Sequence, residues 1–174
     1  GTTASGSVHL GKGAGGSVST GNNSIAIGLL AMDSTVTGDN NIAIGAHAGD
    51  ALTSGYRNVL MGLEAGPGLS TGHNNVGIGA YALRDGTSNI ELNVAVGSFA
   101  GYNITTGIGN VMLGYSTATS AVGDDYSIVI GYGVTAVGGS NTATIGNASL
   151  TDVYMGSDNG GTVHCAAVVE GSSL

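Results

Sequence analysis

The sequence predicts an all-β chain in which very short parallel strands stack into a β-solenoid of about 17-residue coils. Three observations predict this class: a motif recurs at a nearly constant spacing, its apolar residues alternate with a period of two, and glycine accounts for 34 of the 174 residues. Alternation is typical of a strand, and a fixed period is typical of units that bury apolar surface by stacking. Glycine at this density disfavours a helix, since each glycine costs about 1 kcal/mol relative to alanine.

The repeat is clearest when the copies are aligned on the glycine that closes each motif. Gly28, Gly45, Gly62 and Gly79 are evenly spaced, and the interval that follows is longer by a single position. Apolar residues occupy the positions one and three before the glycine, and we expect them to form a stacked core ladder. Its members are Ile25, Ile27, Ile42, Ile44, Val59, Met61, Val76, Ile78, Val94, Val96, Val111, Leu113, Ile128 and Ile130.

The rest of each coil is also patterned. A polar residue precedes each apolar triplet, and we expect the asparagines at this position to form a hydrogen-bonded ladder that closes the turns. Alanine stands three residues after the closing glycine, and an aliphatic residue such as Leu52 or Leu69 stands seven after it in several coils. Each coil is therefore predicted to contain one strong strand, a small-residue corner, a second short strand and a turn. The ladder asparagines are Asn41, Asn58, Asn75, Asn93 and Asn110.

The apolar ladder is long, whereas a single coil of this length is thin. In a monomer, such a ladder would face the inside and leave the second strand weakly covered. In a cyclic trimer, three strong strands share one core around a three-fold axis. We expect a homotrimer, with the chains intertwined or side by side.

Composition and charge exclude several classes of function. The formal net charge is −8, with three basic residues, Lys12, Arg57 and Arg84. A nucleic-acid binder needs clustered Lys and Arg, so we expect no nucleic acid. No apolar run approaches the roughly 20 residues of a membrane span, so we expect no membrane insertion. The single cysteine, Cys165, excludes an intrachain disulfide and is expected to be a small apolar residue.

Motifs that carry chemistry are weak. Gly11 to Gly16 have the spacing of a dinucleotide-binding loop, but that loop must open a helix, and a further repeat strand follows instead. The eleven acidic residues are scattered, without an evident pair for glycoside hydrolysis. In a trimer, His9 or His164 near the axis would form a ring of three, but the histidines lack metal-ligand spacing. We expect no enzymatic activity, no cofactor and no metal.

The motif N-[IV]-A-[IV]-G, with A-G and L-T-S-G between copies, resembles two related groups of proteins. One is the left-handed β-roll head of trimeric autotransporter adhesins, and the other is the repeat region of bacteriophage tail fibres and tail spikes. The strongest copies are 41–45, 58–62, 75–79 and 93–97, and the resemblance covers about residues 5 to 146. Adhesin heads typically use shorter coils, so the length of the period favours the phage group.

The C-terminal stretch, residues 147–174, looks like the segment that precedes an endosialidase-type intramolecular chaperone in phage fibres. The resemblance implies a solenoid domain over 1–146 and a short C-terminal trimeric β-segment over 147–174. It also implies a chaperone that trimerises the chain and then cuts itself off. A chain that ends at Leu174 and does not start with Met is expected to be part of a longer product. Cleavage is a hypothesis that the intact mass of the full-length product would test.

The resemblance implies a structural and receptor-binding segment of a tail fibre, on the outside of the virion, which attaches to the host cell surface alongside other tail proteins. A bacterial adhesin head and a purely structural fibre shaft are the alternatives. The receptor would be a host glycan or protein. Solenoids carry function in irregular loops and exposed turns, which indicates the loop LRDGTSNIEL and the turn tyrosines. The candidate receptor contacts are Tyr56, Arg57, Tyr81, Arg84, Asp85, Glu91, Tyr102 and Tyr126.

Overall fold

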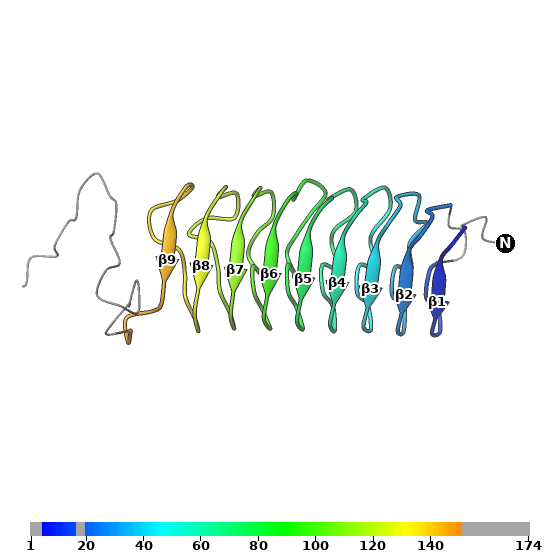
Figure 1. Cartoon of the computed structure of the whole chain (residues 1–174), viewed down its shortest axis with the longest axis horizontal. Helices are drawn as coiled ribbons and strands as arrows, with labels where there is room; N and C mark the ends of the chain where they lie inside the picture. Colours follow the sequence, from blue (N-terminus) through cyan, green and yellow to red (C-terminus); the bar gives the residue numbers. More distant parts are fainter. Residues whose placement is uncertain (1–4, 17–19, 151–174) are drawn as a thin grey trace, which may run out of the picture.

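The structure, a computed structural model, describes residues 5–16 and 20–150. These residues form a single sheet of nine parallel strands that pair in chain order, which makes a β-solenoid of about eight turns, as the repeat predicts. Figure 1 shows the strands side by side along the long axis, with the connecting loops above and below them. The strands are β1 (Val8–Leu10), β2 (Ile25–Ile27), β3 (Ile42–Ile44), β4 (Val59–Met61), β5 (Val76–Ile78), β6 (Val94–Val96), β7 (Val111–Leu113), β8 (Ile128–Ile130) and β9 (Ala143–Ile145).

The register of the sheet follows the sequence period. Ile42 pairs with Val59, which holds the equivalent position in the next coil, and Val76 pairs with Val94 across the longer interval. The extra residue of that coil is therefore accommodated outside the strands. The second short strand expected around Leu52 is not formed. Outside the nine strands, the described residues contain only isolated bridges, such as the one between His73 and Glu91, although Leu52 itself is fully buried.

The expected core ladder does not line the interior of the coil. In β3, Ile42 and Ile44 are half-buried and point outward, whereas Ala43 between them has no exposed surface. The expectation is therefore wrong for a single chain, because the alternation of the strand turns the middle residue inward and its two neighbours outward. The half-buried or exposed ladder residues are Ile25, Ile27, Ile42, Ile44, Val59, Met61, Val76, Ile78, Val94, Val96, Val111, Leu113, Ile128 and Ile130.

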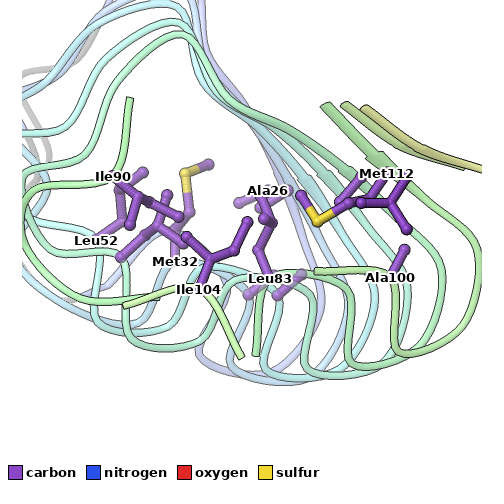
Figure 2. Packing of buried hydrophobic residues seen from close by; sticks show 14 of the residues in the cluster. Ala26, Met32, Leu52, Leu83, Ile90, Ala100, Ile104 and Met112 are labelled. Carbon is purple, nitrogen blue, oxygen red and sulfur yellow. The ribbon is translucent and has the colours of Figure 1, made fainter. Parts of the chain in front are cut away.

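The interior is a thin apolar layer filled from both sides of the coil. The middle residues of the strands, such as Ala26 and Met112, meet residues from the corners and turns. Figure 2 shows Met112 and Ala100 at one end of the cross-section, Leu83 near its centre, and Ile104 toward the other end. All of these side chains are fully buried. The core therefore depends on one strand residue for each coil, and small residues there leave room for longer ones opposite.

The asparagine ladder is confirmed, and it occupies the same inner face as the middle strand residues. Asn58 has no exposed surface. Its side-chain amide donates to Asn41 Oδ1 at 3.1 Å and to the Gly72 carbonyl at 2.8 Å. Its own Oδ1 accepts from the backbone N–H of Asn75 at 3.0 Å. Buried amides are tolerated here because each one is bonded to the coils on both sides.

The glycine that closes each strand is required by both its conformation and its neighbours. Gly45 has a φ of +138°, which L side chains rarely adopt. A Cβ added there would lie 2.3 Å from the carbonyl oxygen of Gly62 in the next coil. Coils can therefore stack at sheet spacing at this corner only if the residue lacks a side chain.

Candidate functional site

A hollow of about 380 Å³ opens at one corner of the solenoid, where two consecutive turns stack. It contains two of the predicted receptor contacts, Tyr56 and Arg57, and both are exposed. The residues that line it with side chains come from the segments 37–40 and 54–57. They are Thr37, Asp39, Asn40, Ser54, Tyr56 and Arg57.

The ring of Tyr56 is held by the coils around it. It stacks on the imidazole of His73 in the next coil, with 4.5 Å between ring centroids and 11° between planes. Nε2 of His73 lies 3.4 Å from Oε2 of Glu91, one coil further on. The guanidinium carbon of Arg57 stands 5.6 Å from the centroid of the Tyr56 ring. The structure thus brings three predicted contacts, Tyr56, Arg57 and Glu91, into one corner, with His73 as the link.

The other wall of the hollow carries Asp39. Its Oδ1 accepts from the backbone N–H of Asn22 at 2.6 Å and from the side-chain amide of Asn22 at 3.3 Å. Among the residues that the structure describes, none donates a hydrogen bond to Oδ2, and the side chain is exposed. The backbone N–H of Arg57 donates to the Asp39 carbonyl at 3.0 Å, which fixes the spacing between the two walls. The hollow thus presents a carboxylate oxygen, a guanidinium and an aromatic ring together.

Sequence reasoning missed Asp39 and Asn40 as members of this site. The signal was present, because these residues stand one full repeat before Tyr56 and Arg57 and so occupy the same places in the preceding coil. Both Asn40 and Arg57 have a positive φ, of 61° and 56°. The same backbone turn therefore presents a different pair of side chains in each coil.

The loop of the longer coil forms a separate corner. Nε of Arg84 donates to Oδ1 of Asp85 at 2.8 Å, and its guanidinium carbon lies 5.6 Å from the centroid of the Tyr102 ring. The hydrogen bond to Asp85 raises the pKa of Arg84 above its usual value, so the guanidinium remains charged. Ile90 from the same loop has no exposed surface. The irregular loop thus contributes to the core as well as to the surface.

The remaining predicted contacts lie outside the hollow and outside the loop of Arg84. Tyr81 stacks on Phe99 with 4.8 Å between ring centroids, and Tyr115 stacks on Tyr132 at 5.0 Å. These rings form a row along the corner after the strands. Sequence reasoning missed this row, although the members of each pair hold equivalent positions in consecutive coils. Tyr126 is 60% exposed, and the structure does not bring it into the hollow.

Within residues 5–16 and 20–150, no three His, Cys, Asp or Glu side chains are grouped closely enough to hold a metal ion. His9 points from the middle of β1 toward the corner at Gly15, where an added Cβ would clash with its ring. His164 and Cys165 lie outside the described residues, as does most of the expected C-terminal segment 147–174. The described part of the chain also contains no helix with the length and apolar character needed to cross a membrane.

Comparisons of the chain with known protein families, with curated proteins and with solved structures find no match in any of the three. A functional assignment therefore depends on the repeated motif and on the two surfaces described above, the outward sheet face and the corner hollow.

Proposed function

We propose that the chain is a structural and receptor-binding segment of a bacteriophage tail fibre, assembled as a homotrimer. The repeated motif resembles that of phage fibres, and the solenoid carries an apolar sheet face on its outside. In this proposal the coils wind left-handed, as in β-roll heads, and the segment lies on the outer surface of the virion among other tail proteins. It attaches to a glycan or protein of the host cell surface and has no catalytic step.

The outward sheet face is the observation that carries the proposal. Nine strands at a spacing of about 4.8 Å make a strip about 38 Å long, and three residues for each strand make it about 10 Å wide. Its area is thus on the order of 400 Å², and apolar patches of this size often mark interaction surfaces. Several of its side chains are well exposed, such as Leu10 at 65% and Ile128 at 42%.

A second copy of the same chain is the partner that fits this strip best. No outward residue of the nine strands is charged, in a chain with a net charge of −8. The strip has a repeat at sheet spacing along its whole length, and a parallel copy presents the same repeat. Three copies around one axis would place three uncharged strips together and keep the acidic turns in solvent. The resemblance to trimeric fibres and adhesins favours three copies over two.

The corner hollow supports a binding role rather than a purely structural shaft. A trimer would present three identical hollows, so weak single contacts would combine into firm attachment through avidity. A bacterial adhesin head would share the same trimeric strip, and the two interpretations differ in the organism whose surface displays the fibre.

The mass in solution tests the assembly. Light scattering of the purified chain should give three times the chain mass of 16.8 kDa. Val96→Lys, which places a charge on the outward face of β6, should shift the chain toward monomer. Val122→Lys is the matched control, because Val122 is 53% exposed but lies in a turn outside the strip. A wild-type monomer, or equal effects of the two substitutions, would contradict the shared core.

Binding of the labelled protein to a panel of bacterial surfaces tests attachment. Saturable, strain-specific binding is the expected result. A trimer that binds no strain would instead indicate a structural shaft, and binding to animal cells or matrix alone would favour an adhesin head.

A further inference from the structure

We infer that the corner hollow is a subsite for a neutral hexopyranose, a single sugar unit of a surface polysaccharide. This inference rests on the proposed attachment function and names the chemistry that the fibre would recognise. The volume of about 380 Å³ lies near the lower end of the range for small-ligand pockets, about 300 to 1,000 Å³. The site is therefore sized for one sugar ring rather than for a folded epitope.

The aromatic wall supplies a platform for such a ring. Tyr56 is covered by His73 on the side of the next coil. Tyr56 lines the hollow together with the preceding corner 37–40, and the guanidinium of Arg57 lies over the ring at 5.6 Å from its centroid. A sugar in the hollow would therefore share the uncovered part of the ring with Arg57. The electron-rich face of a tyrosine attracts the weakly positive C–H groups of a pyranose ring. The stack on His73 holds the platform before any ligand arrives, which lowers the entropy cost of binding.

The polar groups match the hydroxyls of a neutral sugar. Oδ2 of Asp39 accepts hydrogen bonds from hydroxyls, since Oδ1 is already bonded to Asn22. The guanidinium of Arg57 donates to hydroxyl oxygens, and the amide of Asn40 can donate or accept. Two adjacent hydroxyls of a pyranose can donate one hydrogen bond and accept another. An acceptor on Asp39 beside a donor on Arg57 therefore gives specificity for such a pair.

Charge favours a neutral sugar over an acidic one. The hollow contains one carboxylate and one guanidinium, so its formal charge is balanced, and the chain around it carries a net charge of −8. A uronic or sialic acid would place its carboxylate near Asp39 and within the negative field of the whole chain. A neutral ring avoids both costs.

The test uses saturation-transfer NMR of the full chain with galactose, glucose, mannose and N-acetylglucosamine, and with glucuronate and N-acetylneuraminate as acidic probes. At least one neutral sugar should bind saturably at millimolar concentration and more tightly than either acid. The double substitution Tyr56→Asn with Arg57→Asn should weaken binding at least tenfold, as should Asp39→Asn alone. Both variants introduce asparagine, which already occupies the equivalent positions of an earlier coil as Asn22 and Asn23.

Tyr132→Ser is the matched control, because it removes an exposed aromatic ring outside the hollow, at a coil position that Ser98 occupies elsewhere. It should leave sugar binding unchanged. Failure of every neutral probe to bind, tighter binding of an acidic probe, or full binding by the hollow variants would overturn the inference. Binding to cells that survives the hollow variants would overturn the sugar site while leaving attachment intact. Sugar binding without cell binding would support the site and contradict attachment.

Discussion

Removing one amide from the asparagine ladder should destabilise the solenoid far more than an ordinary surface substitution. Asn58→Ala deletes the oxygen that accepts from the Asn75 backbone N–H and the amide that donates to the Gly72 carbonyl. The backbone N–H of Asn75 and the carbonyl of Gly72, which lose their partners, belong to buried residues. Leaving a buried backbone group without a partner costs about 1–3 kcal/mol, so the two together should lower the free energy of unfolding by about 4 kcal/mol.

Asn58→Ser is the matched control, because serine occupies this ladder position in other coils. Ser24 Oγ accepts from the backbone N–H of Asn41 at 3.1 Å. A serine at position 58 can therefore satisfy Asn75 but can reach the Gly72 carbonyl only through a longer bond, like that of Ser7 Oγ to the Gly21 carbonyl at 3.4 Å, which should cost about 1–2 kcal/mol. The order of effects, alanine greater than serine, follows from counting unsatisfied groups and not from side-chain size, since serine and alanine differ by one oxygen.

Guanidinium denaturation followed by circular dichroism measures the global loss, and hydrogen exchange measures the local one. In a repeat protein, each coil is stabilised mainly by its neighbours. The exchange of amides around 73–78 should therefore rise most in the alanine variant. Equal stabilities for the alanine and serine variants, or losses below about 1 kcal/mol for both, would refute the view that the ladder amides hold the coils together.

Four further substitutions test other parts of the fold. Gly79→Ala should cost several kcal/mol, because φ is +131° and an added Cβ would lie 2.5 Å from backbone of the next coil. Gly77→Ala, two residues earlier and within β5, should be neutral or stabilising by up to about 1 kcal/mol, since the atoms nearest to its Cβ are flexible ends of Leu60 and Leu83 at 3.3 Å; thermal denaturation compares the two variants. Ile104→Ala, at a fully buried site, should cost about 2–5 kcal/mol in chemical denaturation. Tyr115→Ala should cost only about 1 kcal/mol by the same measurement, because the lost ring contacts lie on the surface.

The register of the sheet could be predicted from the sequence because one period governs the whole chain. A glycine that must meet its equivalent in the next coil fixes where each strand ends, and the spacing between glycines then gives the pairing. Across the single longer interval, Val76 still pairs with Val94, because the extra residue is accommodated outside the strands. Local conformation and long-range pairing are thus encoded by the same positions.

The direction of the strand side chains could not be predicted by hydrophobicity alone. Ile42 and Ile44 are the more apolar residues of their strand, yet Ala43 faces the interior. Asn41 and Ala43 are two residues apart and so share a face. Once the asparagines are recognised as a ladder bonded through the interior, that parity places alanine inside and both isoleucines outside.

The corner site shows a similar limit. Tyr56 and Arg57 were predicted as exposed turn residues, but a hollow needs two walls, and the second wall comes from the preceding coil. Asp39 can be recognised as a member of the site only when residues at equivalent positions of successive coils are compared. Function in a solenoid is therefore encoded in columns of equivalent positions, with each residue defined by its neighbours one repeat away.

Buried amides allow the inner face of the strands to close each coil and leave the outer face for assembly. The ladder of asparagines and the small strand residues close each coil from within, so the bulky strand residues Ile42 and Ile44 are not needed for the interior. Those residues remain on the outer face, where they are available to another chain. Coil stability and assembly should consequently respond to different substitutions: changes on the inner face at Asn58 act on folding, while a charge on the outer face at Val96 acts on association. A protein in which both substitutions abolished both properties equally would not have this division between its two strand faces.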